Sequence, residues 1–150
     1  MKNILFETIN NFSQCSLLVV GDIILDEYIW GKATRLSPEA PVPVLEVARY
    51  SYIPGGCGNV ASNIKTLGGE VKIVSVIGED IHSELLKDTL NQKGIDTSFL
   101  IKDKDRATTV KTRLIAHNNQ QLARADREIR IPISPETEQK ILDNVLSAIE

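Results

Sequence analysis

Two aspartates follow the first continuous apolar run of the sequence and have the chemistry to bind hydroxyl groups. Asp22 and Asp26 come after residues 17–20, whose sequence Leu-Leu-Val-Val is typical of a strand buried on both faces. In open α/β sheets, ligands bind beyond the carboxyl ends of such strands. A carboxylate there accepts charge-assisted hydrogen bonds from several hydroxyls, as a sugar would require. Alternatively, the aspartates only satisfy backbone N–H groups in a turn.

A glycine-rich segment ahead of a predicted helix is the second candidate for binding. Gly55 and Gly56 have no side chains, so a ligand could approach the backbone closely. Asn59 both donates and accepts hydrogen bonds, which suits a hydroxyl group, and the N-terminus of the helix offers free N–H groups. The alternative is a flexible turn in which Asn59 only caps the helix.

Three basic residues are candidates for binding a phosphate group of the ligand. Lys111 and Arg113 are two residues apart, which places them on one face of a predicted strand. Together with Arg35 they could form a clamp, because ammonium and guanidinium groups bind phosphate oxygens well. The alternative is a solvated edge strand, where lysine and arginine deter aggregation.

The glycine-rich segment also supports a competing interpretation, because residues 56–61 match the dinucleotide-binding fingerprint G-x-G-x-x-A. That fingerprint should follow a buried strand directly, yet the preceding segment is polar and ends in Pro54. The buried strand that should carry it ends in Gly21 and Asp22 instead, and an aspartate would repel a pyrophosphate. No Gly-Lys-Ser/Thr phosphate loop occurs either.

The elements that must position these residues alternate between strand and helix. Strands and helices are expected, in chain order, at residues 17–20, 59–67, 71–77 and 81–94. This order predicts an α/β fold with a mainly parallel sheet and flanking helices. Residues 42–53 and 108–116 alternate apolar and polar side chains instead, which predicts antiparallel strands of a small attached sheet, with a hairpin turn at residues 118–119.

Both ends of the chain predict amphipathic helices. Residues 2–12 carry apolar side chains at helical spacing, and Ser134 followed by Pro135 is a strong helix start. The second helix carries an apolar stripe to Ile149, which another surface must cover. We therefore expect the natural polypeptide to continue beyond Glu150, the alternative being a terminal helix that packs back on the core.

The composition indicates an ordinary globular domain. The chain has 150 residues, of which 42% are hydrophobic and 25% charged, with a net charge of -3. It shows no basic face for nucleic acid, no apolar run of the roughly 18 residues that a membrane span needs, and no signal peptide. Its two cysteines lack metal-ligand spacing. We expect a cytoplasmic protein without a metal site in this chain and without nucleic-acid or membrane partners.

Taken together, the motifs resemble those of pfkB family carbohydrate kinases. The resemblance rests on the N-terminal signature of that family, with one departure at Cys57, where the family usually has glycine, alanine or proline. The matching residues are Gly55, Gly56, Asn59, Ala61, Gly68 and Gly78. Within the family, four segments are most similar to D-glycero-β-D-manno-heptose 7-phosphate kinases, namely residues 20–26, 35–44, 54–56 and 111–126.

The resemblance implies a ribokinase-like α/β core and a β lid formed by about residues 27–53 and 107–126. It implies transfer of the ATP γ-phosphoryl, with Mg²⁺, to the anomeric hydroxyl of the sugar, in lipopolysaccharide heptose synthesis. Asp26 and Asn59 would bind sugar hydroxyls against Gly55 and Gly56, with Asp22 as a weaker candidate. A homodimer through the lid is also implied.

One motif of the family is missing from these residues. The Gly-Ala-Gly-Asp sequence, whose aspartate is the catalytic base of the family, does not occur in residues 1–150. The chain therefore corresponds to the N-terminal half of the kinase domain, with no catalytic residue and without the ATP site. We expect it to be inactive alone. Another sugar kinase and a non-catalytic sugar-binding or dimerisation module remain alternatives.

Overall fold

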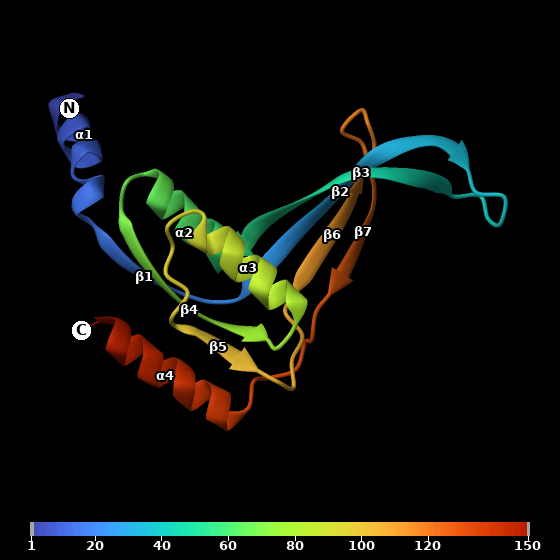
Figure 1. Cartoon of the computed structure of the whole chain (residues 1–150). Coiled ribbons are helices and arrows are strands. Elements are labelled where there is room, and N and C mark those ends of the chain that lie inside the picture. The colour runs from blue at the N-terminus through green and yellow to red at the C-terminus, as the bar shows by residue number, and fades with distance from the viewer. Residues whose placement is uncertain (1, 150) are drawn as a thin grey trace.

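The computed structural model describes residues 2–149, which form a layered α/β core and a long β lid that projects from it (Figure 1). Helices and strands alternate along the chain as follows: α1 Lys2–Asn10, the short 3-10 helix η1 Phe12–Gln14, β1 Ser16–Val20, β2 Ile23–Leu36, β3 Pro43–Gly56, α2 Cys57–Thr66, β4 Glu70–Gly78, α3 Ile81–Asn91, β5 Leu100–Asp103, β6 Val110–Ile115, β7 Gln121–Arg127 and α4 Pro135–Ile149.

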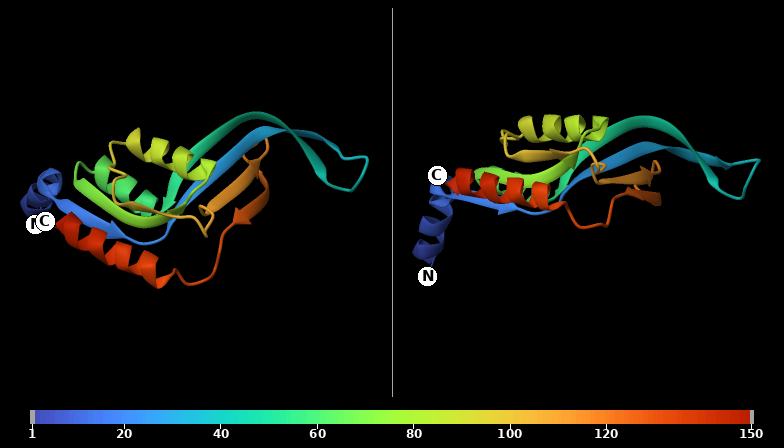
Figure 2. Two further views of the ribbon diagram at one scale, coloured as in Figure 1. Left: turned by 60° about the horizontal axis from the view of Figure 1, so that its bottom comes forward. Right: turned by 90° about the horizontal axis from the view of Figure 1, so that it is seen from below.

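The core sheet is three-stranded and parallel, in the order β1-β4-β5. Helices α2 and α3 cover one of its faces and α4 covers the other (Figure 2). Strand β4 is buried on both faces, as its continuous apolar run predicts. The same prediction for residues 17–20 is wrong, because Leu17 and Val20 of the edge strand β1 are exposed. The predicted α/β core with a parallel sheet and flanking helices is thereby confirmed.

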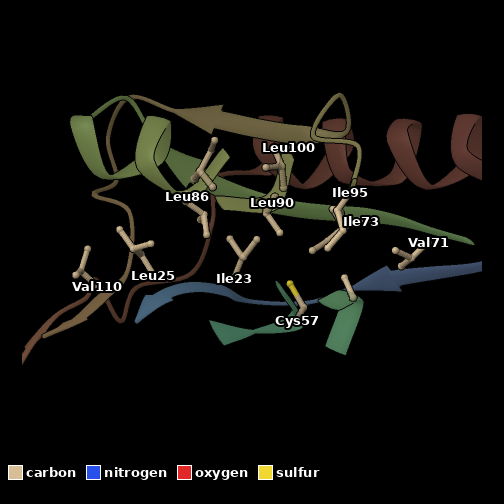
Figure 3. Packing of buried hydrophobic residues seen from close by; sticks show 12 residues of the cluster. Ile23, Leu25, Cys57, Val71, Ile73, Leu86, Leu90, Ile95, Leu100 and Val110 are labelled. Carbon is tan, nitrogen blue, oxygen red and sulfur yellow. The ribbon is translucent and has the colours of Figure 1, made fainter. Parts of the chain in front are cut away.

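The hydrophobic core lies on both sides of β4, whose side chains alternate between its two faces. Ile73 and Ile77 pack with Leu86 and Leu90 of α3 in the larger cluster (Figure 3). Val74 points the other way and joins the smaller cluster beneath α4. The central strand of the core sheet is therefore packed against helices on both of its faces.

The lid is a four-stranded sheet in the order β3-β2-β6-β7, and its long strands β2 and β3 extend well beyond the core (Figure 1). We expected antiparallel strands here, but β2 and β6 pair in parallel, from Leu25 with Val110 to Trp30 with Ile115. Both strands leave the core in the same direction, β2 after β1 and β6 after β5. Only the outer pairs, β2 with β3 and β6 with β7, are antiparallel.

The base of the lid is anchored in the core. Ile23 and Leu25 of β2 are almost fully buried there, as is Val110 of β6. Because side chains alternate along a strand, Ile24 and Asp26 of β2 point to the face of the lid opposite to that of Ile23 and Leu25. Burial of one face thus determines which side chains the other face offers to a ligand.

The predicted starts of two helices are confirmed. The carboxylate of Asp80 accepts a hydrogen bond from the N–H of Ser83 (3.0 Å) at the start of α3. At the start of α4, the hydroxyl of Ser134 accepts one from the N–H of Thr137 (3.1 Å). Between residues 2 and 149, no helix has the length and apolar character needed to cross a membrane.

Candidate substrate-binding site

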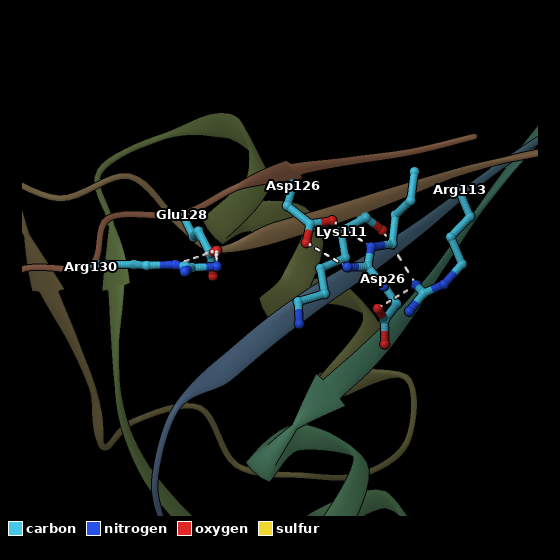
Figure 4. Close-up of polar contacts among 7 residues, drawn as sticks. Asp26, Lys111, Arg113, Asp126, Glu128 and Arg130 are labelled. Carbon is cyan, nitrogen blue, oxygen red and sulfur yellow. Dashed lines mark hydrogen bonds and ion pairs between the residues drawn. The ribbon is translucent and has the colours of Figure 1, made fainter.

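Asp26 lies on the solvent-facing side of the lid, close to the core. It belongs to β2 rather than to a loop after β1, because the chain turns at residues 21–22 and resumes as a strand at Ile23. Its Oδ1 accepts a hydrogen bond from Nη1 of Arg113 at 2.6 Å, and both side chains are about one-fifth exposed, at 20% and 21% (Figure 4). The carboxylate is therefore partly sheltered and held in one orientation.

Gly55 allows the Asp26 carboxylate to lie against the backbone of β3. Gly55 pairs with Ile24 in the antiparallel register. Ile24 is two residues before Asp26 on β2, so both are on the same face of the strand. A Cβ added at Gly55 would lie 2.4 Å from Oδ2 of Asp26. The second carboxylate oxygen therefore points along the glycine segment, where it is available to a ligand.

Gly55→Ala should lower substrate affinity while leaving the fold nearly intact. The added methyl would meet the end of the Asp26 side chain rather than backbone, and this side chain can move only by giving up its present contact with Arg113. A displaced carboxylate loses about one charge-assisted hydrogen bond to the ligand, which corresponds to a rise in KM of roughly 10- to 100-fold. Steady-state kinetics of the longest natural product of the gene, with a melting curve, measure both effects. An unchanged KM would show that the Asp26–Gly55 contact does not serve binding.

Asp22 lies apart from Asp26, just after the carboxyl end of β1 and close to Ser75 of β4. Its carbonyl accepts a hydrogen bond from the N–H of Cys57 at 2.9 Å, and its side chain is exposed. It lines a cavity of about 160 Å³ together with Ser75 and Arg106. Asp22 is therefore placed to contact a ligand at the edge of the core sheet, whereas Asp26 would contact it from the lid.

Asn59 lies in the first turn of α2 and is exposed. The N-cap of this helix is Gly56, and no side chain makes a capping hydrogen bond. The alternative in which Asn59 only caps the helix is therefore wrong. Its amide remains available to a ligand next to the glycine segment.

The basic residues divide into two groups. Lys111 is opposite Asp26 and Arg113 is opposite Tyr28 in the parallel register, so both share the face of Asp26 (Figure 4). Arg35 lies near the far end of β2, opposite Val44, which at about 3.3 Å per residue is roughly 30 Å along the strand from Asp26. Its guanidinium is 3.7 Å from Glu46. Lys111 and Arg113 are therefore brought to the site, but Arg35 of the same chain is not.

Arg106 is a residue of this region that the sequence analysis missed. Its guanidinium donates to the carbonyls of Ile129 (3.0 Å) and Ile131 (2.7 Å), which fixes the segment between β7 and α4. Its Nε is buried and has no partner among residues 2–149. Its position in the sequence could have identified it, because Arg106 follows β5 at the same edge of the sheet as Asp22.

Comparison with known proteins identifies the family. Residues 15–148 match the model of the pfkB family carbohydrate kinases, which is nearly the whole chain. The chain belongs to this family. It is 50% identical over 127 residues to the bifunctional protein HldE of Helicobacter pylori, a match that covers 85% of this chain and 27% of that protein. The chain thus spans about a quarter of the length of that relative.

Solved structures agree on the fold. A putative sugar kinase from Clostridium perfringens superposes with a TM-score of 0.62 at 18% identity, covering 87% of this chain and 41% of that one. The ribokinase of Cryptococcus neoformans in complex with ADP gives 0.51 at 22% identity, covering 75% and 34%. At this level of identity the likeness concerns the pfkB fold alone.

Membership of the pfkB family removes the basis for the dinucleotide interpretation of residues 56–61. In this structure, the segment follows β3, which pairs antiparallel with β2 in the lid. The dinucleotide fingerprint requires a parallel core strand at that position. In this chain Gly56 instead lies against the backbone carbonyl of Asp22, and Gly58 lies against Pro54 and Ile23.

Cys57, the departure from the pfkB pattern, is buried beneath the glycine segment. Its thiol donates to the carbonyl of Gly21 (3.1 Å), which also accepts from the hydroxyl of Ser75 (2.6 Å). Burial raises the pKa of the Cys57 thiol to about 11. The thiol therefore stays protonated at neutral pH and helps to hold the end of β1 against the start of α2.

Thiol reagents should distinguish the two cysteines at pH 8. Cys15 is exposed, whereas Cys57 is buried and has a thiolate fraction of about 10⁻³ at that pH. Iodoacetamide should therefore label Cys15 at least about 100-fold faster. Peptide mass spectrometry over time measures the two rates, and denatured protein, in which the rates should converge, is the control. Equal rates in the folded protein would contradict the buried position of Cys57.

Proposed function

We propose that this chain is the sugar-binding part of a kinase that phosphorylates D-glycero-D-manno-heptose 7-phosphate at its anomeric hydroxyl. The observation that carries the proposal is the shared lid face of Asp26, Lys111 and Arg113 beside the glycine segment. It combines a carboxylate for hydroxyls with a basic side chain for a phosphate group. The similarity to HldE supports the same assignment, including a place in lipopolysaccharide heptose synthesis.

In this proposal, the chain binds and orients the substrate. Oδ2 of Asp26 and the Asn59 amide hold sugar hydroxyls, and Gly55 and Gly56 let the ring lie against the backbone. Asp22 approaches from the core edge. The lid covers the sugar and limits access of water, so that the phosphoryl group passes to the sugar rather than to water.

ATP and Mg²⁺ are assigned to other parts of the natural protein. The Gly-Ala-Gly-Asp motif, whose aspartate is the catalytic base of the family, does not occur in the 150 residues. We therefore assign no step of phosphoryl transfer to this chain and propose that it has no activity alone. The ADP complex of the Cryptococcus ribokinase supports the choice of ATP.

We also propose a homodimer through the lid. The hairpin of β2, β3 and the loop between them extends beyond the core and exposes large apolar side chains, which a second copy would cover. These are Leu36, Val42, Val47 and Tyr50. Light scattering of the natural protein tests this proposal, and a monomeric mass at micromolar concentration would contradict it.

Lys111→Met should lower kcat/KM for a phosphorylated substrate much more than for an unphosphorylated one. Loss of a charge-assisted contact to phosphate should lower kcat/KM for heptose 7-phosphate by roughly 10- to 100-fold, with little effect on heptose itself. Steady-state assays of the natural protein with both sugars and ATP measure the two changes. Equal losses with both sugars would contradict the phosphate contact. Turnover of ribose in preference to heptose 7-phosphate would favour another sugar kinase of the family.

A further inference from the structure

Arg113 differs from Lys111 in what it contacts, although both were expected to bind phosphate. Nη1 of Arg113 donates to Oδ1 of Asp26 at 2.6 Å and lies 3.5 Å from the carbonyl of Lys111. Its guanidinium carbon is 5.2 Å from the centre of the Tyr28 ring. The guanidinium is thus held between a carboxylate and an aromatic face, which leaves it little freedom to follow a ligand.

Lys111 has no such partner, although it is opposite Asp26 on β2 and opposite Asp126 on β7. Asp126 is already paired with Arg124, at 2.8 and 3.0 Å. Among residues 2–149, no carboxylate lies within 4 Å of the Lys111 amine. Figure 4 shows this amine apart from both pairs. Lys111 can therefore reach a ligand phosphate without breaking an ion pair, whereas Arg113 cannot.

The two oxygens of Asp26 have different surroundings. Oδ1 is taken by Arg113, and Oδ2 lies over Gly55, on the side of the glycine segment. An aspartate on a strand has two side-chain torsions, and a fixed guanidinium removes most of their freedom. The pair with Arg113 therefore determines which oxygen faces the sugar and in which direction.

We propose that Arg113 is a positioning residue that orients Asp26 toward the sugar hydroxyls, and that Lys111 alone provides the preference for a phosphorylated substrate. This inference rests on the proposed sugar kinase function. Loss of Arg113 should then lower kcat/KM for phosphorylated and for unphosphorylated sugars by the same factor. It should also have no further effect once the Asp26 carboxylate has been removed.

The test is a double-mutant cycle in the longest natural product of the gene, assayed with heptose 7-phosphate and with heptose. The variants are Arg113→Met, Asp26→Asn and the two combined, with Arg113→Lys as a milder change that keeps the charge. We expect Arg113→Met to lower kcat/KM for both sugars by the same factor of at least about tenfold. The combined variant should be within about threefold of Asp26→Asn alone. Arg113→Lys should recover part of the activity.

A neighbouring arginine provides the matched control. Arg124 is opposite Arg113 on β7 and does not contact Asp26. Arg124→Met should change kcat/KM for unphosphorylated heptose by less than about threefold. Melting curves of all variants show whether a loss of activity reflects unfolding. If Arg113 had a purely structural role, Arg113→Met would lower Tm, and its effect on activity would not depend on Asp26.

The outcomes separate this inference from the proposed function. The inference would be overturned if Arg113→Met lowered kcat/KM for heptose 7-phosphate but not for heptose. It would also be overturned if the effects of Arg113→Met and Asp26→Asn on kcat/KM multiplied in the combined variant. Either result would leave the kinase assignment standing. Failure of the unaltered protein to phosphorylate any sugar would overturn the proposed function and this inference with it.

Discussion

Asp26→Asn should lower kcat/KM for the sugar phosphate by roughly 10³-fold in the longest natural product of the gene. The change removes the charge from two hydrogen bonds that Oδ2 would accept from sugar hydroxyls. Each contributes about 1.5–3 kcal/mol, and each 1.4 kcal/mol corresponds to about tenfold. It also weakens the 2.6 Å contact with Arg113. Initial rates at low sugar concentration with saturating ATP measure the loss directly.

Glu27→Gln is the matched control for Asp26→Asn. Glu27 is the next residue of β2 and lies on the opposite face, where its Oε2 accepts a hydrogen bond from the hydroxyl of Thr112 (2.6 Å). The same loss of one charge there should change kcat/KM by less than about threefold. If Asp26→Asn retained more than a tenth of the activity, or if both variants lost activity equally, the sugar contact would not be at Asp26.

Gly56→Ala should destabilise the fold more than any other single change considered for this site. Gly56 has φ 58° and ψ −132°, a conformation open almost only to glycine. A Cβ there would lie 2.3 Å from the backbone carbonyl oxygen of Asp22, which cannot move without shifting the end of β1. We expect a loss of about 3–4 kcal/mol in the free energy of unfolding and a fall of roughly 10 °C in Tm.

Comparison with Gly68→Ala shows how much of that loss comes from the steric clash. Gly68 also has a positive φ, 91°, but the nearest heavy atom to an added Cβ is 3.6 Å away. This variant should therefore lose only about 1 kcal/mol, the cost of the backbone conformation. Denaturant unfolding of both variants gives the two values. Equal losses would mean that the close approach of Gly56 to Asp22 is not what requires glycine.

The core was predictable from the sequence because its signals are local. Residues 17–20 and 71–77 were expected as strands and lie in β1 and β4, and the caps at Asp80 and Ser134 were found as predicted. Strand β5 was missed, since four residues carry too little periodicity. The antiparallel hairpin of β6 and β7 was found as predicted, but β6 pairs in parallel with β2, because alternation reports which face is wet and not the direction of each neighbouring strand.

The residue types of the site were predictable, but their contacts were not. Asp26, Gly55 and Arg113 were chosen for their chemistry, yet their proximity depends on the register of strands far apart in the sequence. Lys111 and Arg113 looked equivalent as a basic pair, and only the structure separates the arginine held by Asp26 from the lysine without an ion pair among residues 2–149. Arg35 has the same chemistry, but β2 carries it to the far end of the lid.

The most direct test of the proposed function is to incubate the longest natural product of the gene with ATP and D-glycero-D-manno-heptose 7-phosphate, and to follow the products by ³¹P NMR. We expect one ADP formed for each sugar consumed and a new phosphate resonance coupled to the anomeric proton. ATP consumption that does not depend on the sugar, or phosphate transferred to another hydroxyl, would contradict it.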